Sequence, residues 1–306
     1  MMKRKAVKSI GVLIIALSLG AISVATGADF SRGLNAYQNG DYATALEEWM
    51  PLAELGDDKA QYNIGLLYYS GYGVLRDEAE AVSWFRKAAE QGDADAQYNL
   101  GVAYNEGNGV PQDDVQAVHW TQKAAKQSQT NAQFNLGVAY SEGKGVPQDY
   151  VRAMSWFRKA AEQGDADAQH ALGNMYNFGQ GVLQDRTEAA GWFRKSANQG
   201  HASAQSNLGV MYANGLGVPK NHAKAIIFYR KAAEQGLPLA QYNLGAIYRN
   251  GQGVPQNYVT AHKWFNLAAA HGVVEAVKAR AAVSDMMTPK QIADAQAAAS
   301  EWDSKH

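Results

Sequence analysis

A period of 36 residues runs through most of this 306-residue sequence and constrains its fold more than any other feature. An Ala-Gln pair recurs six times at this spacing, and a glycine and a tyrosine keep the same register. The pairs begin at Ala60, Ala96, Ala132, Ala168, Ala204 and Ala240. The glycines are Gly65, Gly101, Gly137, Gly173, Gly209 and Gly245, and the tyrosines are Tyr68, Tyr104, Tyr140, Tyr176, Tyr212 and Tyr248. Such regularity indicates a tandem array of one supersecondary unit.

Each repeat begins with a predicted helix, which we call helix A. In the second repeat Asp93 can cap its N-terminus. Ala96, Leu100 and Tyr104 follow at the i, i+4 and i+8 spacing of one buried helical stripe. Gly101 lies beside this stripe, and glycine inside a helix costs about 1 kcal/mol relative to alanine. Its recurrence therefore predicts two helix backbones that pack closely.

A second helix, helix B, follows a glycine-containing turn in each repeat. Its predicted N-cap residues are Asp77, Asp113, Asp149, Asp185, Asn221 and Asn257. One phase of helix B holds Trp84, Trp120, Trp156, Trp192, Phe228 and Trp264, which we expect in the core. One such hairpin cannot bury its apolar face alone, so neighbouring repeats must stack. The sequence therefore predicts a single all-α solenoid rather than the two domains that its length suggests.

The repeat pattern resembles a known family. In the second repeat it is Ala96-Gln97-x-x-Leu100-Gly101-x-x-Tyr104, followed by Asp113-x-x-x-Ala117-x-x-Trp120. This resembles the Sel1-like repeat, a close relative of the tetratricopeptide repeat, and six full copies cover residues 58–273. Residues 29–57 resemble a divergent N-terminal helical repeat. Residues 274–306 resemble a C-terminal extension of capping helices, in which Thr288 is a good N-cap and Pro289 a good first helical residue. The resemblance implies a right-handed α/α solenoid that acts as an adaptor or scaffold in protein complexes.

The N-terminus has the features of a cleavable signal peptide. Four basic residues lie within the first nine positions, an uncharged apolar run covers residues 10–25, and small residues surround Ala25 and Ala28. The alternative is a retained anchor, although a run of about 16 residues is short for a span of roughly 20. Cleavage is expected after Ala25 or after Ala28, and we take residues 1–28 as the signal peptide. The mature protein would then be periplasmic, or alternatively secreted, and would not span the membrane.

The charge and cysteine content limit the possible partners. Without the four basic residues of the leader, 24 basic residues remain against 29 acidic ones, a net charge of −5. Nucleic-acid binding is not expected, because phosphate affinity depends on clustered Lys and Arg. The sequence has no cysteine, so it has neither a disulfide nor a lipoprotein acceptor. We expect a monomer that binds a protein or peptide.

No catalytic arrangement stands out from the repeat background. The seven histidines are His119, His170, His201, His222, His262, His271 and His306. They form neither an H-E-x-x-H motif nor an i, i+4 pair, so we interpret them as surface or partly buried polar residues. The Gly-x-Gly-Val segments lack the third glycine of a dinucleotide loop, and no strand is predicted before them. We expect no enzyme activity, metal or cofactor. A cysteine-rich branch of the family is linked to β-lactam chemistry, and a cell-envelope enzyme of that kind remains a weaker alternative.

The predicted binding surface lies on helix A, opposite its buried stripe, by analogy with tetratricopeptide solenoids. Its residues are Asn63, Asn99, Val102, Glu106, Asn135, Val138, Glu142, Asn174, Phe178, Asn207, Val210 and Asn243. Because an amide offers both donors and an acceptor, the asparagines can hold the backbone of an extended peptide. Alternatively, they bond to neighbouring repeats and only hold the stack. The fourth repeat departs from the pattern with Asn174 and Phe178, which is either a specificity pocket or drift. The predicted function is an exported adaptor, with a secreted host-interaction factor as the alternative.

Overall fold

The computed structural model describes residues 28–305, and every regular element in this range is an α-helix. The predicted signal peptide and its cleavage positions lie outside the described residues, apart from Ala28. Among the residues that are described, no helix is both long and apolar enough to span a membrane.

Contacts divide the chain into two compact units, the first ending at Gln163 and the second beginning at Gly164. The 36-residue register continues through this boundary, so both units consist of the same repeat. The helices of the first unit are α1 (Phe30–Gln38), α2 (Tyr42–Glu54), α3 (Asp58–Ser70), α4 (Glu78–Gln91), α5 (Ala94–Glu106), α6 (Asp114–Lys126), α7 (Thr130–Glu142) and α8 (Tyr150–Glu162). Those of the second are α9 (Ala166–Phe178), α10 (Arg186–Asn198), α11 (Ala202–Asn214), α12 (His222–Glu234), α13 (Pro238–Asn250), α14 (Tyr258–Ala270), α15 (Val274–Ser284) and α16 (Pro289–Asp303).

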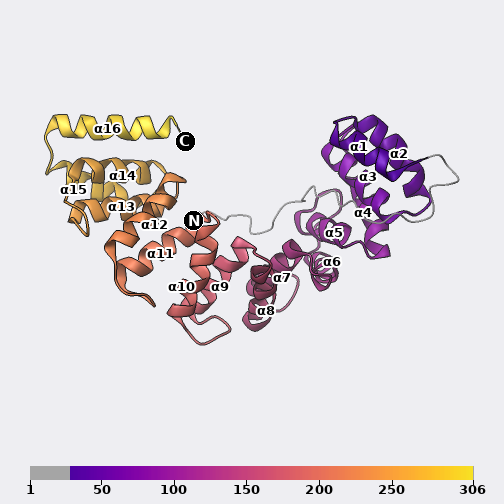
Figure 1. Ribbon diagram of the computed structural model, residues 1–306, viewed down its shortest axis with the longest axis horizontal. Coiled ribbons are helices and arrows are strands. Elements are labelled where there is room, and N and C mark those ends of the chain that lie inside the picture. The colour runs from indigo at the N-terminus through magenta and orange to yellow at the C-terminus, as the bar shows by residue number, and fades with distance from the viewer. Residues whose placement is uncertain (1–27, 306) are drawn as a thin grey trace. The chain divides into compact units, whose positions relative to one another are not determined.

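Within each unit the helices pack in chain order (Figure 1). Odd-numbered helices from α3 to α13 are helix A of their repeats, and the even-numbered helices from α4 to α14 are helix B. Inside a unit, each helix contacts mainly the helices before and after it in the chain, as expected of a solenoid. The exception is the C-terminal end, where both α15 and α16 pack on α14.

The recurrent glycine of helix A permits the close packing that the sequence predicts. A Cβ atom at Gly137 would lie 2.6 Å from the ring of Phe157 in helix B, and one at Gly173 would lie 2.5 Å from the ring of Phe193. The corresponding distance from Gly101 to Thr121 Oγ1 is 2.5 Å. No side chain fits at these positions unless the neighbouring residue moves. The helix A backbone thus packs closely on a helix B ring at Gly137 and Gly173, and it approaches the helix B backbone at Gly101, where the Cβ would lie 3.1 Å from the Ala117 carbonyl oxygen.

The glutamine of each Ala-Gln pair has a structural role that the sequence did not reveal. In the second repeat Gln97 Nε2 donates to the carbonyl of Ala89, 3.0 Å away in the preceding helix B. Gln127, which follows the helix B of the same repeat, donates to Gln97 Oε1 at 2.9 Å and to the carbonyl of Gly92 at 2.8 Å. The other pairs in this glutamine ladder are Gln61–Gln91, Gln133–Gln163, Gln169–Gln199 and Gln205–Gln235. The ladder thus joins each repeat to the preceding one.

The predicted helix caps are present. Each predicted Asp or Asn side chain accepts from a backbone N–H in the first turn of its helix B. Asp93 does the same for α5, with an Oδ1–N distance of 2.7 Å to Ala96. Thr288 caps α16 through a capping box with Gln291, and Pro289 is the first helical residue.

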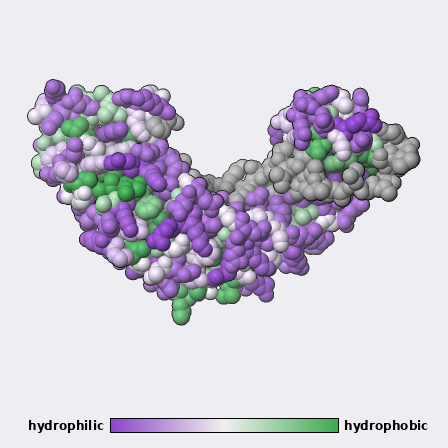
Figure 2. Space-filling view, viewed as in Figure 1, coloured by the Kyte–Doolittle hydropathy of each residue, from purple (hydrophilic) through white to green (hydrophobic). Residues whose placement is uncertain are grey.

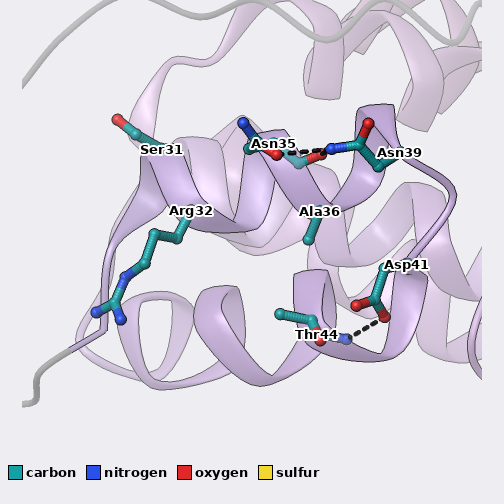
Figure 3. Close-up of a pocket in the computed structure, with 7 residues that line it drawn as sticks. All are labelled: Ser31, Arg32, Asn35, Ala36, Asn39, Asp41 and Thr44. Carbon is teal, nitrogen blue, oxygen red and sulfur yellow. Dashed lines mark hydrogen bonds between the residues drawn. The ribbon is translucent and has the colours of Figure 1, made fainter.

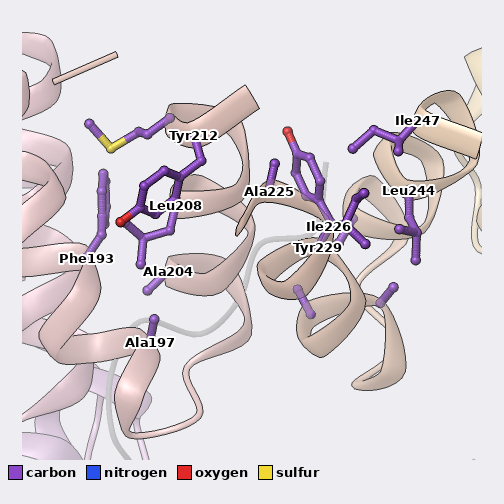
Figure 4. Packing of buried hydrophobic residues seen from close by; sticks show 14 of the residues in the cluster. Phe193, Ala197, Ala204, Leu208, Tyr212, Ala225, Ile226, Tyr229, Leu244 and Ile247 are labelled. Atoms are coloured by element: carbon purple, nitrogen blue, oxygen red, sulfur yellow. The ribbon is translucent and has the colours of Figure 1, made fainter. Parts of the chain in front are cut away.

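The apolar core runs between successive helices in both units. In the second unit Leu208, Tyr229 and Leu244 are buried among helices α11 to α13 (Figure 4). Four of the five tryptophans at the predicted core phase are buried, and Trp156 is half-buried. At the C-terminal end Trp302 of α16 meets Trp264 edge to face, with ring centroids 6.3 Å apart. The last helix therefore covers apolar surface of α14.

Candidate protein-interaction surface

We use the term helix A face for the twelve predicted site residues and their immediate surroundings. In the first unit most of these residues are buried rather than exposed. Asn63 and Asn99 are 2% and 1% exposed, and Asn135, Val102 and Val138 are also buried. The remaining two, Glu106 and Glu142, reach the surface, where Glu106 accepts from Asn108 at 2.9 Å. The binding role of these positions stays a prediction.

An ionic link borders the helix A face of the first unit. Lys59 of α3 forms an ion pair with the buried Asp93 that caps α5. Burial opposes the charge of Lys59, but its hydrogen bond and ion pair with Asp93 outweigh that effect and raise its pKa. Burial also raises the pKa of Asp95, as does the nearby charge of Asp93.

In the second unit the predicted residues are more accessible. Asn174, Asn207, Val210 and Asn243 are half-buried, and the ring of Phe178 at the end of α9 is 68% exposed. Within the described part of the chain, the Asn243 side chain makes no hydrogen bond. Apolar side chains also gather on the surface over α11 to α13 (Figure 2).

The asparagines of α9 and α11 meet around a histidine. Asn207 Nδ2 lies 3.2 Å from His170 Nε2 and 3.4 Å from Asn174 Oδ1. Asn174 Nδ2 lies 3.4 Å from the same histidine nitrogen. At this interface the amides therefore bond between repeats, as the structural alternative expects, while Asn243 does not.

A second histidine completes this cluster. His201 stands at the N-cap of α11, where its Nδ1 accepts from the Ala204 N–H at 3.1 Å. Its Nε2 lies 3.1 Å from Asp167 Oδ1, and its ring stacks on His170 with centroids 4.6 Å apart. These contacts make the cluster a connected polar network on the helix A face.

A shallow depression between α1 and α2 offers no comparable chemistry (Figure 3). Asn39 donates to Asn35 Oδ1 at 2.7 Å, and Asp41 accepts from the Thr44 N–H at 3.2 Å as the cap of α2. Arg32 pairs with Glu48 at 3.6 Å. These polar groups are therefore used by the N-terminal hairpin itself. In residues 28–305, no three histidine or acidic side chains are grouped closely enough to hold a metal ion.

A family model for the Sel1 repeat matches six consecutive segments, which together run from residue 58 to residue 273. The chain belongs to the Sel1 repeat family. The matched segments are residues 58–93, 94–129, 130–165, 166–201, 202–237 and 238–273, the same register as the Ala-Gln pairs.

Solved structures agree with this assignment. A Sel1 repeat protein from Oxalobacter formigenes is 35% identical, with a TM-score of 0.69 over 77% of this chain and 94% of that one. A protective antigen of uropathogenic Escherichia coli strains, described as having an SLR fold, is 30% identical. It covers 89% of this chain and 83% of its own, with a TM-score of 0.52. No curated protein matches the chain significantly.

The histidine pair is the part of the site that the sequence interpretation missed. His170 and His201 occupy different positions of the Sel1 repeat, so they form no ladder along the sequence. Two comparisons within the repeat could have found them. His201 stands where earlier repeats place the helix caps Asp93, Gln129 and Asp165, and His170 stands where Phe134 packs on helix B. Aligning the repeats position by position therefore indicates both contacts.

Proposed function

We propose that this Sel1 repeat protein is a non-enzymatic scaffold that binds a protein or peptide segment along its helix A face. The observation that carries the proposal is the presence of side chains that the stack does not use. Phe178 is largely exposed, and among the described residues the half-exposed amide of Asn243 has no hydrogen-bond partner. The two helices of a repeat are meanwhile held together by the close contacts of the helix A glycine, and the ladder glutamine Gln205 bonds to Ala197 of the preceding repeat.

The chemistry of this face suits an extended polypeptide. Asparagine amides can donate to backbone carbonyls and accept from backbone N–H groups. An exposed aromatic ring supplies contact area with little conformational entropy to lose, and aromatic residues are enriched among interface hot spots. In the second unit α11 carries no charged residue and α9 carries a single acidic one, Asp167. The partner segment therefore needs apolar and backbone groups more than opposite charge.

We further propose that residues 1–28 direct export of the chain and are then cleaved off, and that the mature protein acts as a monomer in the periplasm. The basic, apolar and small-residue regions of the leader support export. Secretion and a role in host contact form the second candidate. The resemblance to the uropathogenic Escherichia coli antigen, over most of both chains, favours it. Detection of the mature chain in the medium of intact cells, without a periplasmic marker, would select secretion.

In-cell photo-crosslinking tests the binding face. A crosslinking residue would replace Phe178 or Asn243 in separate variants, and Ile227 of α12 would serve as the matched control, since it is apolar and 52% exposed on helix B. We expect a discrete adduct of the same partner from the first two positions and none from Ile227. Equal labelling from all three positions, or no adduct at all, would reject the helix A face as the binding surface.

A further inference from the structure

The hydrogen bonds of His201 assign its protonation state. Its Nδ1 accepts from the Ala204 N–H, so that nitrogen carries no proton. Its Nε2 lies 3.1 Å from Asp167 Oδ1, so the single ring proton is donated to the carboxylate. A further proton would have to enter at Nδ1, where it would remove the N-cap acceptor of α11.

His170 contacts two asparagines of the helix A face, Asn174 and Asn207. Its Nε2 is approached by Asn207 Nδ2 at 3.2 Å and by Asn174 Nδ2 at 3.4 Å, and amide nitrogens are donors. The neutral ring therefore accepts at this nitrogen. If Nε2 gains a proton it becomes a donor, and both amides must turn their oxygens towards it. What Asn174 and Asn207 present to a ligand then reverses.

The stacked geometry couples the two rings. With centroids 4.6 Å apart and planes inclined by 25°, two imidazolium charges would repel strongly. A proton on one ring therefore disfavours a proton on the other. Histidine is the side chain that ordinarily changes charge between pH 5 and 8.

Within the second unit, an acidic side chain contacts the pair. This is Asp167 on α9, and α11 has no charged residue. The neighbouring helix α10 presents the ring of Phe193 to His170, with centroids 5.7 Å apart. Two charged residues of α10 bond to other groups, with Arg194 donating to Tyr212 and Glu188 accepting from Trp192.

We propose that the His170–His201 pair is a proton-operated switch that changes the hydrogen-bonding pattern of the helix A face. A proton taken up at Nε2 of His170 converts that nitrogen from acceptor to donor and rotates the amides of Asn174 and Asn207. Its consequence for binding rests on the proposed function, because the switch acts on the same face. The rotation itself does not depend on any partner.

The switch is tested on the free full-length chain by NMR, from about pH 8 to about pH 5, the range in which histidine changes charge. We expect the side-chain amide signals of Asn174 and Asn207 to move with the same midpoint as the His170 ring. The amide of Asn243, at the equivalent position of the last repeat, should stay constant. Amide signals of Asn207 that do not change with pH would overturn the proposal.

Two variants introduce residue types that other repeats of this chain have at the equivalent position. In His170→Phe, a phenyl ring takes the position that Phe134 has in the preceding repeat, where it packs on Phe157. This variant should abolish the pH response of Asn207. His201→Gln gives α11 the same type of N-cap residue as α7, which Gln129 caps. In this variant His170 should titrate in a single step. A pH response of Asn207 that survives in His170→Phe would show that another group controls it.

The effect on binding is measured separately with the crosslinker at position 178. We expect the yield of adduct to differ roughly two- to tenfold between about pH 7.5 and pH 5.5, the size of one altered hydrogen bond, and the difference to vanish in His170→Phe. Equal yields in the unmodified background would reject the regulation of binding. Absence of adduct at every pH would instead reject the proposed function, and the amide titration would still decide whether the switch exists.

Discussion

The positions through which helices pack on one another, which we call the stacking side, are nearly constant from repeat to repeat. The helix A face, in contrast, changes along the chain. On the stacking side, Gly173 and Gln205 have counterparts in all six repeats. On the helix A face, the position of Asn99 holds alanine in the fourth repeat, and the position of Glu106 holds Phe178. Every interface of a solenoid needs the same contacts, so the residues that make them recur. A binding face has no such requirement, and its variation is where recognition can reside.

Two helical glycines provide the largest test of this distinction. In Gly173→Ala the new Cβ would lie 2.5 Å from the Phe193 ring, so the helices must separate or the ring must move. We expect the variant to lose about 1–3 kcal/mol of unfolding free energy, the usual cost of overpacking. Urea denaturation followed by circular dichroism measures this loss.

Gly191 of α10 is the matched control, because a Cβ there meets no atom within 4 Å. Replacing it with alanine should stabilise the protein by up to about 1 kcal/mol, since glycine is the poorer helix former. If the two alanine variants changed stability in the same direction, close packing at the recurrent glycine would not be what holds helix A against helix B.

The glutamine ladder provides the second test. Gln205 is buried, accepts from Gln235 at 2.8 Å and donates to the Ala197 carbonyl at 3.3 Å. Gln205→Ala removes both bonds, and we expect a loss of about 1 kcal/mol, the net contribution of a typical hydrogen bond. Gln296→Ala, on the exposed surface of α16, should stay within about 0.5 kcal/mol of the parent in the same urea experiment. A similar loss in both variants would mean that the ladder adds nothing beyond helix propensity.

The sequence predicted the fold well because the solenoid depends on local patterns that repeat. Caps such as Asp113, the buried tryptophans and the close approach at Gly137 each follow from helix periodicity and cap chemistry. The candidate site was predicted less fully, because its contacts join positions that differ between repeats. His170 reaches Asn207, 37 residues further along the chain, and no single-helix pattern contains that pair.

Burial was the other quantity that periodicity could not supply. An angular position opposite the core stripe of helix A gives no measure of what covers it. Asn99 and Val102 are almost completely buried, whereas the half-exposed Asn243 occupies the same repeat position as Asn99. Exposure at a fixed position thus depends on the neighbouring elements as well as on the helix.

One residue of the stacking side differs in type from the residues at the same position of the other repeats. Its replacement should have the smallest effect on stability. His262 of α14 is 2% exposed at a position that holds Ile226 in the preceding repeat. Among the described residues no group bonds to its Nδ1. Burial lowers the pKa of His262, and the positive charge of Arg280 lowers it further. The neutral ring is therefore the form that the folded C-terminal end accommodates.

The sign of the pH effect follows from this. Because the pKa of His262 is lower in the folded chain than in the unfolded one, unfolding binds a proton in the acidic range. The contribution of His262 to stability should be intact above about pH 6.5, the ordinary histidine value, and should decline as the pH falls from there towards the lowered value. Urea midpoints measured across this range by circular dichroism follow the decline.

His262→Ile isolates this residue, since it restores the side chain of the preceding repeat and removes the titrating group. Subtracting its stability from that of the parent cancels the contribution of the other histidines, including the His170–His201 pair. We expect the difference between parent and variant to grow in favour of the variant as the pH is lowered. A difference that does not depend on pH would mean that the charged ring is tolerated beside Arg280. The stacking side would then accept variation as readily as the helix A face, and the distinction between the two surfaces would fail at the C-terminal end.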